Sequence, residues 1–168
     1  MLWILRRTSL EVFLITFAPL WIASIIEEEY FWMRVSVSIL AGLIFFSWYL
    51  IIGLKLNEQL PDESFKPDLF FKLNWFYVLA LFSTSVIIGD PENANKEMPI
   101  YIMVLVVYFV FAFFYLVYFT ANAYVKVFAS DKTLPREELI LFAFMAIPLG
   151  VWIVQPRIRK MFIGKELI

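Results

Sequence analysis

Ile100 to Phe128 reads IYIMVLVVYFVFAFFYLVYFTANAYVKVF, and Lys126 is the one charged side chain in these 29 residues. A hydrocarbon core about 30 Å thick needs roughly 20 apolar residues in a helix, so this stretch predicts a membrane-spanning helix. At about 1.5 Å per residue the helix is longer than the hydrocarbon is thick. We therefore expect it to tilt or to protrude into water.

Four similar segments accompany this stretch, and together the five lie at about 10–26, 35–54, 70–88, 100–128 and 139–154. Apolar residues make up 62% of the chain and aromatic residues 20%, which is more than a soluble domain of 168 residues can bury. No small-x-small cleavage site follows the first segment, so we expect a retained span rather than a signal peptide. The sequence predicts an all-α polytopic transmembrane bundle that forms a single integral membrane domain, 1–168.

The composition argues against most enzymatic chemistry. The chain contains no histidine and no cysteine, which excludes Ser-His and Cys-His pairs, cysteine-ligated zinc, iron–sulfur clusters and bis-histidine haem. No Walker sequence and no GxGxxG is present, and the net charge of −1 gives no sign of a nucleic-acid partner. We expect a protein that is not an enzyme and has no catalytic residue, cofactor or metal.

The fifth apolar segment is interrupted by Pro148-Leu149-Gly150. Proline removes a helical hydrogen bond, so we expect a helix break at Pro148 and Gly150. Two architectures are compatible with a break: four full spans plus a broken or re-entrant fifth segment, or five full spans. Transporters use broken helices to hold ions near the midplane, but a simple kink is the favoured interpretation of one such signal.

Lysines and arginines indicate orientation, because positive charge accumulates on the cytoplasmic side of a membrane. With five crossings, eight basic residues share the side of the N-terminus: Arg6, Arg7, Lys55, Lys66, Lys72, Lys126, Lys132 and Arg136. The opposite side then holds Arg34, Lys96, Arg157, Arg159, Lys160 and Lys165. Without the last crossing the asymmetry becomes twelve against two, which favours the re-entrant architecture with both termini cytoplasmic.

The fourth segment carries a pattern of polar tips, which we call the tyrosine stripe: Tyr101, Tyr108, Tyr115, Tyr118 and Asn122. Three tyrosines and the asparagine recur every seven residues, a spacing that places them on one helical face. One interpretation is a path or groove for a small amphipathic molecule. The favoured one is a helix–helix interface whose hydroxyls bond to neighbouring helices.

The end of the fifth segment and the residues after it form a motif typical of a membrane exit. We expect Trp152 at the interface and Gln155-Pro156 at the end of the helix. The basic side chains that follow would meet anionic phospholipid at about 1 kcal/mol each. The candidate contacts to lipid or to a partner are Trp152, Gln155, Arg157, Arg159 and Lys160.

These residues carry a resemblance to a family. The segment IPLGVWIVQPRIRK at Ile147–Lys160 contains the pattern Pro-x-Gly-x-Trp-x-x-Gln-Pro-Arg, and from about Phe45 onward the chain resembles a group of small, uncharacterised polytopic bacterial membrane proteins. Less specific shared residues are Gly53, Asn57 and Pro61, Phe71 to Asn74, and Tyr118 to Ala121. The resemblance implies a multi-pass protein of the bacterial cytoplasmic membrane with no assigned activity and carries over no catalytic residue.

The sequence therefore predicts a non-enzymatic membrane protein that acts through helix–helix contacts, as an accessory or scaffold subunit or as a homo-oligomer. Its expected partners are membrane lipids and either further copies or another membrane subunit. The small residues Ser38 and Gly42, and Ala80 and Thr84, have the spacing of close helix contacts. The alternative is a small pore or transporter whose path follows the tyrosine stripe, with hydroxyls from the run Ser83–Ser85.

Overall fold

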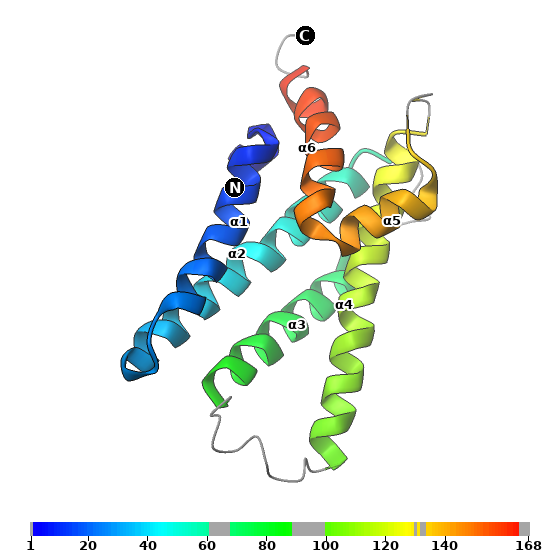
Figure 1. Ribbon diagram of the computed structural model, residues 1–168. Helices are drawn as coiled ribbons and strands as arrows, with labels where there is room; N and C mark the ends of the chain where they lie inside the picture. The colour runs from blue at the N-terminus through cyan, green and yellow to red at the C-terminus, as the bar shows by residue number, and fades with distance from the viewer. Residues whose placement is uncertain (1, 61–67, 89–99, 130, 132–133, 165–168) are drawn as a thin grey trace.

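The computed structural model describes residues 2–60, 68–88, 100–129, 131 and 134–164 (Figure 1). The predicted all-α class is confirmed, because the described residues form helices and no strand. The α-helices are α1 Ser9–Ile25, α2 Phe31–Asn57, α3 Asp68–Ile88, α4 Ile100–Val127, α5 Glu137–Met145 and α6 Ile147–Gly164. Two 3₁₀-helices precede α1 and α2, η1 Leu2–Arg6 and η2 Glu28–Tyr30.

The molecule is a membrane-embedded helical bundle. Three helices, α2, α3 and α4, are long and apolar enough to cross a membrane, and α5 with α6 forms a fourth candidate span that is bent by 110°. The first predicted span corresponds to α1, an apolar helix of 17 residues whose length of about 25 Å is less than the hydrocarbon thickness. The bend between α5 and α6 confirms the prediction of a broken fifth segment.

The helix α2, which was expected at 35–54, is longer than predicted at both ends. The helix begins four residues earlier, at Phe31, and ends at Asn57. At the C-terminal end the backbone N–H of Glu58 still donates to Leu54 O at 2.9 Å. Aromatic and polar side chains at the membrane boundary mark a change of solvent, and nothing in them stops the backbone from continuing as a helix.

The bundle is built from helical hairpins in chain order. The helix α1 lies beside α2, and α2 in turn lies beside α3 and α4 (Figure 1). Phe17 of α1 meets Phe45 of α2 edge to face at 6.1 Å between ring centroids. Pro19 lies inside α1 and does not end it.

Two apolar clusters form the core. One joins α2, α3 and α4, where Phe71 and Phe119 stack with their ring centroids 4.1 Å apart. The other joins α2, α4, α5 and α6 around Tyr49, whose hydroxyl donates to the carbonyl of Phe144. A Cβ added to Gly42 would lie 2.2 Å from the ring of Phe82, so this glycine makes room for an aromatic ring rather than for a second small residue.

The break in the fifth segment lies at Ala146, where φ and ψ of −89° and 64° leave the helical region. Pro148 falls in the first turn of α6, where a missing N–H leaves no helical bond unmade. Gly150 is required by packing, because a Cβ there would lie 1.8 Å from the carbonyl oxygen of Ala143 in α5. The glycine lets the start of α6 cross the backbone of α5.

The expectation that Gln155-Pro156 ends the helix is wrong. Helix α6 continues to Gly164 with Pro156 in its interior. Contacts on both sides of the proline hold the helix: Gln155 and Arg159 bond to η1, and Nη1 of Arg157 donates to Ile153 O at 3.4 Å. A proline ends a helix when the freed backbone has no other support, and here neighbouring side chains supply it.

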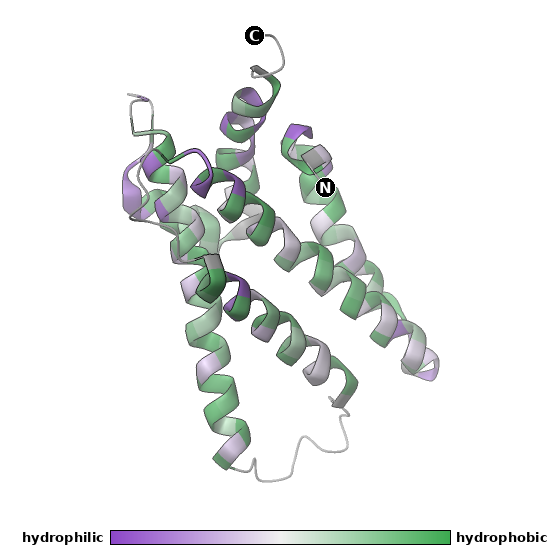
Figure 2. Ribbon diagram, turned by 180° about the vertical axis from the view of Figure 1, so that it is seen from behind, coloured by the Kyte–Doolittle hydropathy of each residue, from purple (hydrophilic) through white to green (hydrophobic). Residues whose placement is uncertain are grey.

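Helix α6 returns the chain to the end of the bundle where η1 lies, and both termini are at that end (Figure 1). Figure 2 shows hydrophilic residues around the termini and the α4–α5 connection, whereas α4 is mostly apolar along its length. The basic residues Arg6, Arg7, Arg157 and Arg159 therefore share one end. Four others in the charge argument, Lys66, Lys96, Lys132 and Lys165, lie outside the described residues.

Candidate functional site

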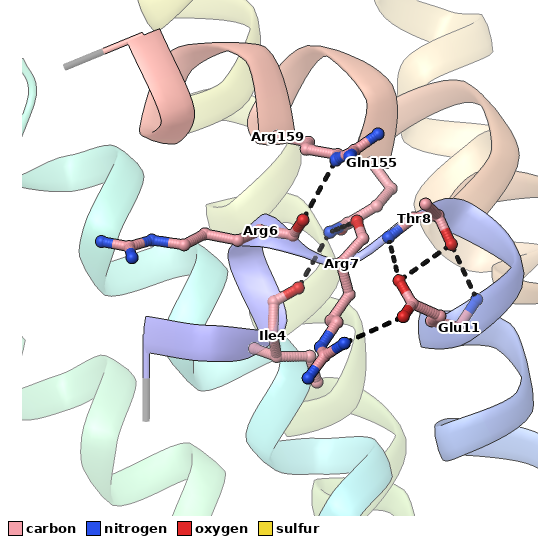
Figure 3. A network of polar contacts seen from close by, with 7 residues as sticks. All are labelled: Ile4, Arg6, Arg7, Thr8, Glu11, Gln155 and Arg159. Carbon is pink, nitrogen blue, oxygen red and sulfur yellow. Dashed lines mark hydrogen bonds and ion pairs between the residues drawn. The ribbon is translucent and has the colours of Figure 1, made fainter. Parts of the chain in front are cut away.

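The predicted lipid or partner contacts of the C-terminal segment fall on two different faces of α6. Gln155 and Arg159, one helical turn apart, face η1 (Figure 3). Trp152, Arg157 and Lys160 instead line a groove toward the α4–α5 connection. The two faces have different surroundings and different chemistry.

Gln155 is fully buried against the N-terminal segment. Its Nε2 donates to Ile4 O at 3.0 Å and to Arg7 O at 3.1 Å (Figure 3). It also donates, more weakly, to Leu5 O at 3.4 Å. The last carbonyls of a helix have no partner within it. Gln155 donates to carbonyls at and just after the end of η1 from a helix about 150 residues further along the chain, and one of them, Ile4 O, also accepts from the backbone N–H of Arg7 at 3.3 Å.

Arg159 extends the same contact. Its Nε donates to Arg6 O at 3.1 Å (Figure 3). Two side chains of α6 therefore bond to the four consecutive carbonyls of residues 4–7. We call this set the N-terminal clasp: Gln155 and Arg159 with the carbonyls of Ile4, Leu5, Arg6 and Arg7. The clasp accounts for the position of η1 on the bundle, and it places Gln155 inside the protein rather than against lipid.

A second polar group starts α1 beside the clasp. Thr8 and Glu11 form a capping box: Glu11 N–H donates to Thr8 Oγ1 at 3.3 Å, and Thr8 N–H donates to Glu11 Oε2 at 2.8 Å. Arg7 pairs with Glu11 at 2.9 Å and lies 5.3 Å above the ring of Trp3. Exposed ion pairs contribute little, about 0 to 1 kcal/mol, so these contacts mainly fix the direction in which the chain enters α1.

On its other side α6 borders a depression of about 630 Å³, which we call the α6 groove. It is lined by Phe128, Asp131, Trp152, Ile153, Pro156, Arg157, Lys160 and Met161. Arg157 Nε pairs with Asp131 Oδ2 at 3.2 Å. Trp152 is 50% exposed, so its indole forms an accessible wall of the groove.

The tyrosine stripe divides among different surroundings. Tyr108 faces α3, where its hydroxyl donates to Asn74 Oδ1 at 3.1 Å and its ring meets Tyr77 edge to face at 4.6 Å. Tyr77 completes the contact by donating to Leu105 O at 3.0 Å. Tyr115 also faces α3, with its ring 4.9 Å from that of Phe70.

The other members of the stripe lie elsewhere. Tyr118 and Asn122 border a depression of about 230 Å³ against α5, together with Glu137 and Glu138. Tyr101 is 65% exposed near the start of α4. The stripe therefore contributes to an interface with α3 and, separately, to a small polar depression beside α5.

The hydroxyl run on α3 bonds to its own helix. Ser83, Thr84 and Ser85 donate to backbone carbonyls three or four residues earlier, at 2.7 to 2.9 Å. Hydroxyls in membrane helices commonly make this bond, and it occupies their donor protons.

Sequence reasoning missed several residues of the site. The capping box Thr8-x-x-Glu11 has a readable signature, since a hydroxyl residue followed three positions later by glutamate starts many helices. Asp131 and the η1 carbonyls have no such signature, because one acidic residue in a connection and a row of backbone oxygens look alike in any sequence.

Comparisons with known proteins give no match: no family model, no curated protein and no solved structure is similar to this chain. The resemblance to a group of small bacterial membrane proteins therefore stays a prediction.

Proposed function

We propose that this chain is a non-enzymatic integral membrane protein that acts through helix–helix contacts, as an accessory or scaffold subunit or as a homo-oligomer. The observation that supports this role is the exposure of the first half of α4. Large apolar side chains there are open on several sides of the helix, with Ile100 at 79% and Val107 at 64%. Helix α3 packs on one side of this half through Tyr77 and Tyr108, and α2 meets the end of it at Phe113.

A membrane helix gains little by exchanging lipid tails for leucine, so association depends on packing and on polar contacts. The first half of α4 offers a long apolar surface with the exposed phenol of Tyr101 near its end. A second membrane helix could pack against the apolar surface and accept a hydrogen bond from the Tyr101 hydroxyl. The pore alternative has less support, since Tyr108 and the α3 hydroxyls already donate within the bundle.

We propose further that the protein resides in a bacterial cytoplasmic membrane, with both termini on the cytoplasmic side. The positive-inside rule supports this orientation, because η1 and α6 bring basic residues from both chain ends to the same end of the bundle. In this orientation the α5–α6 pair enters the membrane and leaves it on the same side, so the C-terminus stays on the side of the N-terminus.

The test uses single cysteines, for which the chain offers a clean background because it has none. Val107→Cys places a thiol on the exposed half of α4, and Leu14→Cys, at a side chain 48% exposed on α1, is the matched control. Membranes containing each variant would be oxidised, and disulfide-linked products identified by mass. A reagent with a maleimide at one end and a photoreactive benzophenone at the other would capture a partner that has no cysteine, because the activated benzophenone inserts into C–H bonds of the partner.

A crosslinked dimer at Val107 and none at Leu14 supports the homo-oligomer. An adduct to one other membrane protein at Val107 supports the accessory subunit. If Val107 gives no adduct and the chain extracted in a mild detergent has the mass of a monomer, the proposed role is refuted.

A further inference from the structure

The α6 groove has a direction. Trp152, Pro156 and Lys160 follow one another at intervals of four residues, so they share a face of α6 and span about 12 Å along its axis. Only apolar residues of α6, Trp152 and Ile153, line the groove nearest the α5–α6 break, and both cations, Arg157 and Lys160, lie nearer the chain end, where Met161 also lines it. The groove thus changes from apolar to cationic toward the end of the bundle.

The α6 groove also carries a net positive charge. Arg157 and Lys160 supply two positive charges, and Asp131 supplies one negative charge, so the groove carries a net charge of +1. Asp131 is paired with Arg157, whose Nη1 also donates to Ile153 O. Lys160 is exposed and makes no ion pair with any residue in the described part of the chain. An ion-paired guanidinium and an exposed ammonium therefore line the same groove.

From this arrangement we propose that the α6 groove binds one anionic glycerophospholipid, with the headgroup phosphate between Lys160 and Arg157 and an acyl chain past Trp152. Lysine binds phosphate as a point charge, and arginine offers several donors in a fixed geometry. Along the axis of α6 the indole of Trp152 comes before the ammonium of Lys160, and this order matches that of acyl chain and phosphate in a lipid leaflet. This site goes beyond the proposed function, because it needs no partner protein.

The opposite face of α6 does not offer the same chemistry. Gln155 is buried, and neither Gln155 nor Arg159 lines the groove, because both side chains point to the N-terminal segment and bond to its carbonyls. Of the three basic residues Arg157, Arg159 and Lys160, the lipid phosphate therefore contacts Arg157 and Lys160.

The experiment measures lipid retention by native mass spectrometry on the full chain in a mild detergent. Phosphatidylglycerol is titrated against phosphatidylcholine, and inorganic phosphate is added as a competitor. The variants are Lys160→Gln, Lys160→Glu and Arg136→Gln; the last is a matched control that removes one exposed positive charge outside the groove. Because both sites are exposed, none of these changes should disturb folding, and a thermal melt checks this.

We expect one phosphatidylglycerol per chain, bound about fivefold more weakly in Lys160→Gln, the factor that about 1 kcal/mol per basic residue implies. Lys160→Glu should weaken binding further, and Arg136→Gln should leave it unchanged. Equal losses in Lys160→Gln and Arg136→Gln would overturn the site in favour of a diffuse charge effect. Equal retention of phosphatidylcholine, or displacement of the lipid by millimolar phosphate, would also overturn it.

Discussion

Replacing Gln155 with leucine should open the N-terminal clasp. Gln155 Nε2 makes two well-placed hydrogen bonds, at 3.0 and 3.1 Å, and a weaker one at 3.4 Å. A net contribution of about 1 kcal/mol per good bond gives about 2 kcal/mol, and the carbonyls of Leu5 and Arg7, which lose this donor, raise the total to roughly 2 to 3 kcal/mol; Ile4 O keeps the N–H of Arg7. The free energy of releasing η1 from α6 should fall by this amount.

The assay reports on η1 directly. Leu5 is almost completely buried, so a cysteine at this position reacts with a maleimide only when η1 leaves α6. With about 1.4 kcal/mol per factor of ten, the labelling rate of Leu5→Cys should rise about 30- to 150-fold in the Gln155→Leu background. A cysteine at the exposed Leu14 should label at the same rate in both backgrounds.

Gln155→Glu provides a sharper comparison. The side chain keeps its shape, but its carboxylate replaces a donor with an acceptor that faces three carbonyl oxygens. Labelling of Leu5→Cys should then be at least as fast as in Gln155→Leu. A change in labelling rate of less than about threefold is within the precision of such measurements. If neither substitution changes the rate by more than this, the hydrogen bonds of Gln155 do not hold η1 on α6, and the proposed role of the clasp is refuted.

Three further predictions concern the break, the α3–α4 interface and the orientation. Gly150→Ala should destabilise the α5–α6 crossing by about 3 kcal/mol, since its Cβ would meet the Ala143 carbonyl, and an unchanged melting temperature in detergent would contradict this. Tyr108→Phe should cost about 0.6 to 2 kcal/mol through the lost bond to an amide of α3 and leave solute flux into reconstituted vesicles unchanged; altered flux would revive the pore. In intact cells an impermeant maleimide should label Glu29→Cys and not Lys160→Cys, and the reverse pattern would refute the orientation.

Much of the fold was predictable because membrane solvent imposes length and composition on each span. The five apolar segments and the break near Pro148 follow from those constraints. The course of the chain through Pro156 did not, because a proline ends a helix only where tertiary contacts fail to hold it, and those contacts come from η1. Local sequence carries no record of them.

The candidate site was less predictable than the fold. The five C-terminal contact residues formed one predicted group, yet Gln155 and Arg159 bond to backbone carbonyls near the other end of the chain. A backbone acceptor has no residue signature. The tyrosine stripe divided for two geometric reasons. Tyr118 is offset from the heptad positions that face α3, whereas Asn122 shares that spacing but lies further along α4, where α5 is the neighbour.

The N-terminal clasp also has a consequence for biosynthesis. Ile4 leaves the ribosome 151 residues before Gln155, which at 5 to 20 residues per second is an interval of about 8 to 30 s. During that time the carbonyls of η1 have no partner from α6. The first turn of the nascent chain can therefore reach its final position only after nearly all the rest has been inserted, and a chain that stalls before Gln155 presents a loose N-terminal segment to membrane proteases.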